Sequence, residues 1–335
     1  MRFLEDFYGN DRQKAYFSSL IAEGKCSHAY ILEAPAGSGK KTFARLLAAA
    51  IAFSSEKAEN ERDAKCRRIM EGTSPDVMML TREEGKKSIG VDATRDFCAS
   101  VYLTPSELSF KMYIFDEADK ITPQAQNALL KIIEEPPHGV YMVLLCENSL
   151  SLLSTVRSRA QKISLEVFEE EKLRAYARAN ALPGADDEEK LSFALHMAGG
   201  SIGKLMTLLE SGDTEFSAYS TAKKVVEGQV SKGRGVSYFD FLKNITDFAS
   251  TREALDALTK YLLSAYGDLI RIKHTDDPPL HFFGAQEAEK IALFLTTEAI
   301  ADSFSATDSV RADTLYNTSL SLSAATLAMA LWKVC

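Results

Sequence analysis

A glycine-rich loop between a short apolar run and an amphipathic helix constrains this 335-residue chain more than any other feature. The loop reads Ala-Pro-Ala-Gly-Ser-Gly-Lys-Lys-Thr over residues 34–42 and follows the apolar run His28–Leu32. After the loop, Ala44, Leu47, Ala48 and Ile51 recur at helical spacing. Glycines let backbone N–H groups turn inward, and a helix N-terminus adds the positive end of its dipole. This pattern favours the binding of phosphate groups.

The candidate phosphate-binding residues of this loop are Gly37, Ser38, Gly39, Lys40, Lys41 and Thr42. A lysine at the position of Lys40 reaches the β- and γ-phosphates in such loops. The loop departs from the motif at Ala34, the first glycine position, and at Lys41, where a hydroxyl normally holds Mg²⁺; Thr42 comes one position late. A glycine-rich turn without a ligand is the simpler alternative, but the whole pattern favours phosphate binding or descent from it.

A pair of carboxylates follows a second apolar run. Ile114 and Phe115 lead into Asp116 and Glu117, as in the acidic motif that accompanies phosphate loops. In that role Asp116 would hold Mg²⁺, directly or through water, and Glu117 would position or activate the attacking water. The alternative is a strand that ends in a solvated acidic turn. A phosphate loop upstream on another strand makes the catalytic interpretation the better one.

Short apolar runs alternate with helical patterns over the first half of the chain. The runs Val77–Leu80, Met112–Phe115 and Tyr141–Cys146 suit central strands of a parallel sheet, which are buried on both faces. Thr122 and Pro123 form a good N-cap and first helical residue for the segment that follows. The alternation predicts an α/β layer with right-handed crossovers.

The remainder of the chain reads as helical. Short helices between breaks follow residue 166, and longer helices continue to an apolar segment, Leu320–Trp332. The predicted fold class is therefore α/β plus all-α. We expect three domains, at residues 1–165 (a P-loop parallel-sheet domain), 166–210 (a small helical lid) and 211–335 (a C-terminal helical domain).

Composition narrows the location and the chemistry. No apolar run is long enough to span a membrane and no signal peptide opens the chain, so we expect a cytoplasmic protein without membrane partners. A net charge of −8 argues against tight binding of DNA by this chain alone. The cysteines are scattered without a C-x-x-C pair, which argues against disulfides and against a metal site; they are Cys26, Cys66, Cys98, Cys146 and Cys335.

Several segments in order along the chain resemble the bacterial clamp-loader family of AAA+ proteins. The residues Asn-Ala-Leu-Leu-Lys-Ile-Ile-Glu-Glu-Pro-Pro at 127–137 resemble a helix of that family. Residues 154–160 match its Ser-Arg-Cys element except in the last residue. Residues 27–32 and 8–10 also fit, and the weaker match at 200–204 extends the likeness beyond the first domain.

The resemblance implies a three-domain AAA+ subunit whose last domain is a helical collar in a five-membered ring. Such a ring opens the sliding clamp and places it on primed DNA, with ATP and Mg²⁺ bound between subunits. Arg159 occupies the position of the arginine that reaches a neighbour's ATP. The backbone at Gly9 and Asn10 would lie near the adenine. The implied partners are gamma/tau and delta-like subunits, and indirectly the clamp and DNA.

Four features favour the delta-prime type, which donates its arginine and supports the ring, over the hydrolysing gamma/tau type. Lys41 replaces the Mg²⁺-binding hydroxyl; Glu147, beside Asn148, takes the polar sensor position; Gly203 takes the second-sensor arginine position. The fourth is that the chain stops at residue 335 without the long extension of tau. An active AAA+ ATPase, either a gamma/tau-like motor or a DNA-repair relative, is the alternative. A P-loop kinase of small molecules has little support.

The relatives' zinc module is also reduced. Cys66 keeps its last cysteine position, whereas nearby Asn60 and Asp63 are not thiols. A structural zinc site takes four ligands, so the sequence predicts no zinc.

Overall fold

Two compact units make up the chain: Met1–Glu169 with Gly200–Lys204, and Glu170–Gly199 with Leu205–Cys335. The computed structural model describes residues 3–53, 59–210, 213–232, 235–275, 278, 280–314 and 319–334. Cys335 and the side chain of Asn60 lie outside the described residues. The predicted division into three domains, with boundaries at residues 165 and 210, stays a prediction.

The described part of the first unit contains one parallel sheet of five strands in the order β2-β3-β4-β1-β5. The strands are β1 (Ala29–Glu33), β2 (Val77–Leu80), β3 (Lys111–Phe115), β4 (Val140–Cys146) and β5 (Gln161–Ser164). Strands β3, β4 and β1 lie in the middle and are buried almost throughout, which agrees with their apolar runs. The sequence did not predict β5, because this edge strand carries mostly exposed polar side chains.

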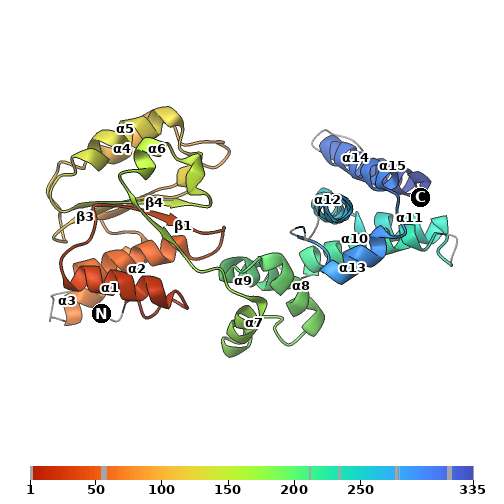
Figure 1. Cartoon of the computed structure of the whole chain (residues 1–335), viewed down its shortest axis with the longest axis horizontal. Coiled ribbons are helices and arrows are strands. Elements are labelled where there is room, and N and C mark those ends of the chain that lie inside the picture. The colour runs from red at the N-terminus through yellow and green to blue at the C-terminus, as the bar shows by residue number, and fades with distance from the viewer. Residues whose placement is uncertain are drawn as a thin grey trace. The chain divides into compact units, whose positions relative to one another are not determined.

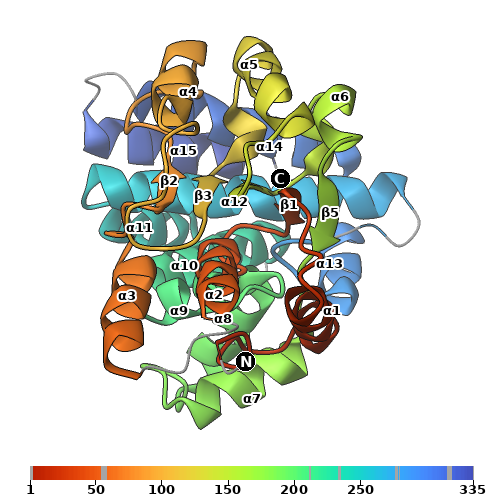
Figure 2. The same cartoon turned by 90° about the vertical axis from the view of Figure 1, so that its left-hand side faces the viewer.

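Helices cover both faces of the sheet. In Figure 1, α1, α2 and α3 lie on one face and α4, α5 and α6 on the other, and Figure 2 shows the same layers from the side. Their bounds are α1 (Asp11–Ala22), α2 (Lys40–Ala52), α3 (Glu59–Glu71), α4 (Val91–Cys98), α5 (Pro123–Glu134) and α6 (Ser154–Arg157), with short 3-10 turns η1 (Ala118–Lys120) and η2 (Ser149–Ser151). The sheet flanked by helices confirms the predicted α/β fold.

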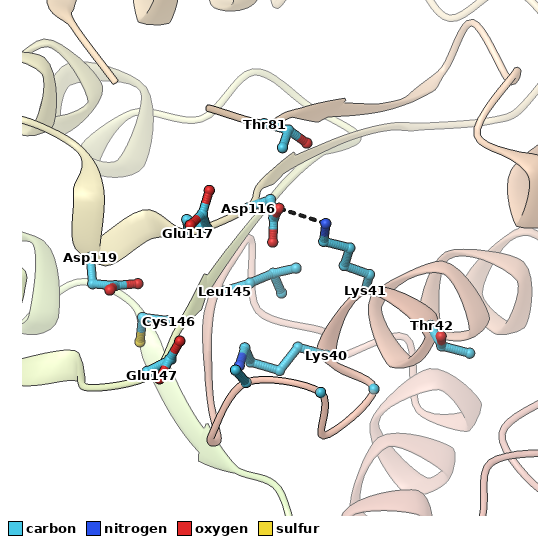
Figure 3. A pocket seen from close by; sticks show the side chains of 13 residues that line it. Lys40, Lys41, Thr42, Thr81, Asp116, Glu117, Asp119, Leu145, Cys146 and Glu147 are labelled. Atoms are coloured by element: carbon cyan, nitrogen blue, oxygen red, sulfur yellow. Dashed lines mark ion pairs between the residues drawn. The ribbon is translucent and has the colours of Figure 1, made fainter. Parts of the chain in front are cut away.

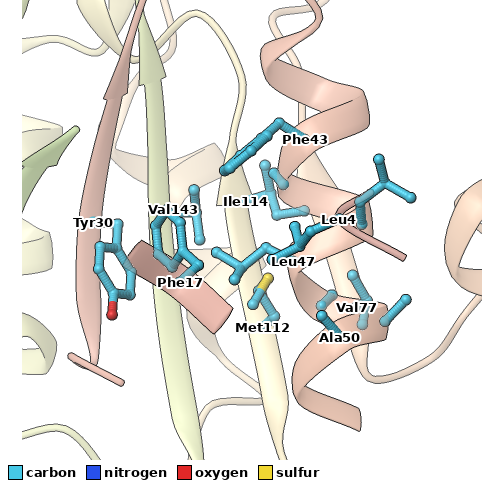
Figure 4. Packing of buried hydrophobic residues seen from close by; sticks show 14 of the residues in the cluster. Leu4, Phe17, Tyr30, Phe43, Leu47, Ala50, Val77, Met112, Ile114 and Val143 are labelled. Atoms are coloured by element: carbon cyan, nitrogen blue, oxygen red, sulfur yellow. The ribbon is translucent and has the colours of Figure 1, made fainter. Parts of the chain in front are cut away.

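The core between the sheet and α1 and α2 fixes the glycine-rich loop in place. Phe43 and Leu47 of α2 are fully buried and share one apolar cluster with Ile114 of β3 and Val143 of β4 (Figure 4). The ring of Phe17 lies 5.6 Å from that of Phe43, centroid to centroid. Because β1 belongs to the sheet and α2 is anchored on it, the loop between them has little freedom at either end.

The start of α5 forms as the sequence predicts. Thr122 has an extended backbone and its hydroxyl accepts a hydrogen bond from Ala125 N at 3.3 Å, while Pro123 opens the helix. Leu129, Ile132 and other apolar residues of α5 pack on the second face of the sheet.

The second unit is helical in its described residues. Its helices are α7 (Glu170–Ala179), α8 (Glu188–Ala198), the greater part of α9 (Ile202–Glu210), α10 (Asp213–Val230), α11 (Tyr238–Phe248), α12 (Arg252–His274), α13 (Ala285–Ala292), α14 (Thr297–Thr314) and α15 (Leu320–Val334). This agrees with the predicted all-α remainder and its apolar last helix. Across the described residues, no helix has both the length and the apolar character that crossing a membrane requires.

Candidate functional site

A cavity of about 520 Å³ opens at the carboxyl edge of the sheet, where the glycine-rich loop and the ends of β2, β3 and β4 meet (Figure 3). The carboxyl ends of parallel strands all face one edge, which is where ligands of such sheets bind. The cavity is lined by Ala36, Gly37, Gly39, Lys40, Lys41, Thr42, Thr81, Asp116, Glu117, Asp119, Leu145, Cys146 and Glu147. It thus unites the glycine-rich loop with both predicted catalytic carboxylates.

The loop has the backbone of a phosphate loop. Gly37 and Gly39 have φ of +75° and +77°, a backbone region that residues with a Cβ rarely adopt. Lys40, however, turns back on its own loop: its Nζ donates to Ala34 O at 2.6 Å and to Pro35 O at 2.9 Å. Burial lowers the pKa of the Lys40 ammonium, and the Glu147 carboxylate is the neighbouring charge that opposes this most.

Both carboxylates after β3 are held by basic side chains. Lys41 Nζ lies 2.8 Å from Oδ2 of Asp116, whose side chain is only 7% exposed. Arg82 donates two hydrogen bonds to Glu117, from Nε to Oε2 at 3.1 Å and from Nη2 to Oε1 at 3.2 Å. Arg82 also donates to the carbonyl of Lys86. In the described residues, therefore, neither of the two predicted catalytic groups is without a cationic partner.

The residues present do not fit Mg²⁺. This ion takes oxygen ligands in a near-octahedral set, usually with a hydroxyl from the position after the loop lysine. That position carries the Lys41 ammonium, which has no oxygen and already engages Asp116. In Figure 3 the Thr42 side chain lies away from Asp116, so it does not replace the missing hydroxyl. Within the described ranges, no group of three or more His, Cys, Asp or Glu side chains could hold a metal ion.

The outer side of the loop is closed by residues that follow α8. Gly203 N donates to Gly37 O at 2.9 Å, and a Cβ on Gly37 would lie 2.6 Å from Ser201 Oγ. Ser201 itself is fully buried. Residues 200–204 thus pack against the loop as part of the first unit. The contact leaves no room for a side chain on either glycine, since a Cβ on Gly203 would lie 2.6 Å from Gly37 O.

Replacing Gly203 by alanine should open this contact. The added methyl would clash with the Gly37 carbonyl and remove one hydrogen bond, which is worth about 0.5–1.5 kcal/mol. We expect amide hydrogen exchange across residues 35–40 to accelerate by roughly 2- to 10-fold, measured by mass spectrometry. Gly90→Ala is the matched control, because nothing lies within 4 Å of a Cβ there. Equal exchange in both variants would show that the contact does not hold the loop.

Gly9 and Asn10 lie outside the residues that line the cavity. Both have left-handed backbones, with φ of +60° and +57°. Asn10 N donates to Glu166 Oε2 at 3.1 Å, and Glu166 N donates to Asn10 Oδ1 at 2.7 Å. The rings of Tyr8 and Phe168 pack beside them, 5.4 Å apart between centroids. This local arrangement ties the start of the chain to the segment that leaves β5. Ser38 is likewise absent from the described lining, and its buried hydroxyl makes no hydrogen bond.

Arg159 stands apart from the cavity, just after α6. Its side chain is 40% exposed, and its Nε lies 2.8 Å from Glu134 Oε1. Its Nη1 donates to Thr155 O at 3.0 Å. The buried Gln126 of α5 holds the chain ahead of α6, because its Oε1 accepts from Leu153 N at 2.7 Å. The sequence-predicted arginine is thus held by Glu134 and Thr155 and lies outside the residues that line the cavity.

Sequence reasoning missed Thr81 and Arg82 at this site. Both follow directly on β2, whose predicted run ends at Leu80. The usable signal was positional, because residues after any strand of a parallel sheet gather at one edge. Asp119 and Cys146 were also unassigned; burial raises the pKa of the Cys146 thiol to about 12, so it is a neutral group there.

A phosphate loop after β1, an acidic pair after β3 and the strand order β2-β3-β4-β1-β5 define an AAA+-type P-loop domain. Residues 9–169 match the family model described as DNA polymerase III, delta subunit. Over these residues the chain is similar to the DNA polymerase III clamp-loader family.

Curated relatives include two kinds of subunit. DNA polymerase III subunit gamma of Buchnera aphidicola (from Acyrthosiphon pisum, strain APS) is 29% identical over 213 residues, which cover 62% of this chain and 58% of that protein. DNA polymerase III subunit delta' of Yersinia pestis is 34% identical over 138 residues, 41% of each chain. The chain thus spans about half the length of the curated relatives it matches. A solved gamma subunit-related protein of Thermotoga maritima overlaps 95% of this chain and 98% of its own, at 17% identity and a TM-score of 0.49.

Proposed function

We propose that this chain is a delta-prime-like clamp-loader subunit, which supports ATP-driven loading of the sliding clamp onto primed DNA during replication. In this proposal it donates Arg159 to the ATP of a neighbouring subunit and hydrolyses ATP weakly or not at all. The observation that carries the proposal is the pairing of both Asp116 and Glu117 with basic side chains, Lys41 and Arg82.

The pairing matters because ATP hydrolysis needs these two carboxylates for other tasks. Asp116 would have to hold Mg²⁺, and Glu117 would have to orient the attacking water. A carboxylate oxygen that already accepts from an ammonium or a guanidinium has fewer lone pairs left for a metal ion or a water molecule. Glu147 adds a further negative charge to the cavity, where a γ-phosphate would be repelled.

Arg159 has the properties that donation in trans requires. It lies on the surface next to Glu134, and an ion pair between such exposed groups contributes only about 0–1 kcal/mol. Little free energy is therefore lost when the Arg159 guanidinium leaves Glu134 for a phosphate of the neighbouring subunit. A guanidinium placed against a transferring phosphoryl group stabilises the charge that develops there.

The partners in this proposal are gamma/tau and delta-like subunits in a cytoplasmic ring, with the clamp and DNA reached through the assembly. If the chain holds ATP, the proposed binding residues are those of the loop, Gly37 to Thr42, with Gly9 and Asn10 beside the adenine.

An active gamma/tau-like ATPase is the second candidate, and the similarity to gamma subunits over 62% of this chain favours it. Steady-state ATP hydrolysis by the isolated chain, with clamp and primed DNA added, separates the two. We expect the wild type and Lys40→Ala to turn over ATP at the same background rate. Brisk hydrolysis by the wild type that Lys40→Ala abolishes would contradict the delta-prime-like role and favour the motor.

A further inference from the structure

The ion pair between Lys41 and Asp116 joins two positions that share one cation in other P-loop proteins. The residue after the loop lysine supplies a hydroxyl to Mg²⁺, and the first acid after another strand of the sheet supplies a carboxylate. Here the two side chains meet directly, with Nζ 2.8 Å from Oδ2 (Figure 3). A positive charge therefore already lies where these two groups would converge on a metal ion.

The surroundings keep this ammonium in place. Asp116 is buried and lies at the end of β3, whose residues pack on both faces of the sheet. Lys41 lies in the first turn of α2, which contains no acidic residue, so Asp116 supplies the negative charge that this helix start lacks. Arg82 forms an ion pair with Glu117, whereas the Lys41 ammonium forms its ion pair with Asp116.

We propose that the Lys41 ammonium occupies the cation position of this pocket and excludes a divalent metal ion. The inference rests on the proposed function, since it concerns the same phosphate loop. ATP or ADP in this pocket then contacts Lys40 and Lys41 without Mg²⁺. The affinity of the chain for either nucleotide is therefore independent of Mg²⁺. A hydroxyl at position 41 removes the tethered cation, frees the Asp116 carboxylate and restores a place for the metal ion.

Calorimetric titration of the full chain with ATP and with ADP, in excess Mg²⁺ and in EDTA, tests this. For the wild type we expect nucleotide affinities that agree within about twofold in the two buffers, or no binding in either buffer. A tenfold difference in affinity corresponds to about 1.4 kcal/mol. Lys41→Thr should bind ATP at least about tenfold more tightly in Mg²⁺ than in EDTA. The free Mn²⁺ signal in electron paramagnetic resonance should fall below the level set by ADP alone for the variant and not for the wild type.

Lys25→Thr is the matched control, because Lys25 also forms an ion pair, 2.9 Å from Glu23, on the surface of the same unit. It should behave as the wild type. Lys41→Ser provides a second hydroxyl variant, and the 53% exposure of Lys41 makes loss of folding unexpected. Tenfold tighter binding by the wild type in Mg²⁺, or indifference of both hydroxyl variants to Mg²⁺, would overturn the inference. Neither result touches the role of Arg159, which is measured through the ATPase of the assembled ring.

Discussion

Replacing Arg159 by alanine should abolish most of the ATP hydrolysis at the neighbouring subunit's site while leaving this chain's own nucleotide affinity unchanged. An arginine supplied in trans is worth about 10³- to 10⁵-fold in turnover. In a reconstituted ring whose only intact ATP site lies next to this subunit, we expect steady-state ATPase to fall by roughly 10³-fold. Calorimetry on the isolated variant would check that nucleotide binding is unaffected.

The control for this experiment is Arg157→Ala. Arg157 is exposed at the end of α6, two residues from Arg159, and should leave the ring ATPase within about twofold of the wild type. Arg159→Lys should retain only part of the activity, because an ammonium lacks the planar fork that matches phosphate oxygens. Unchanged ring ATPase in Arg159→Ala would remove the trans role, even if the ring still assembles.

The substitution Asp268→Ala should destabilise the second unit by about 2–6 kcal/mol, because each buried backbone donor left unsatisfied costs about 1–3 kcal/mol. Asp268 of α12 is fully buried and lies 2.9 Å from Arg271 Nη1. Its carboxylate also accepts hydrogen bonds from the backbone N–H groups of His281, Phe282 and Phe283. Without it, the N–H groups of the buried Phe282 and Phe283 lose their partner.

Urea unfolding followed by tryptophan fluorescence measures the free energy of unfolding of the second unit. The chain has one tryptophan, Trp332 of α15, whose ring packs 5.2 Å from that of Phe241. The matched control is Asp256→Ala. Asp256 lies on the surface of the same helix, α12, and its carboxylate is 3.2 Å from Arg311. This substitution should cost less than about 1 kcal/mol. Similar midpoints for the two variants would show that the buried carboxylate does not anchor the segment after α12.

Much of the first unit could be predicted from local pattern. The run Tyr141–Cys146 became most of β4, because a strand buried on both faces must be apolar throughout. The run Val77–Leu80 became β2, but β2 is a partly buried edge strand and not the central strand that its apolar residues predicted. Thr122 and Pro123 marked the start of α5 correctly, because capping chemistry depends on neighbours in the chain. Strand β5 was not predicted, since its polar side chains face solvent and, among the described residues, it pairs with β1 alone.

The site shows the same division. Spacing and residue type were enough to nominate the loop and the acids Asp116 and Glu117, and the structure places them in one cavity. The same reasoning identified Lys41 only as a missing hydroxyl. That its ammonium pairs with Asp116, and that Arg82 pairs with Glu117, depends on the alignment of β1, β2 and β3.

The glycine-rich loop, its departure at Lys41 and the alternation of apolar strands with helices could all be recognised without the structure. These are properties of neighbouring residues, which backbone geometry and apolar periodicity express locally. The folded structure was needed to show which charges pair with one another and that Gly203 contacts Gly37. The paired charges are far apart in the chain, and they meet because parallel strands bring their carboxyl ends to one edge of the sheet. Gly203 reaches Gly37 from the start of α9, a contact that no local sequence pattern encodes.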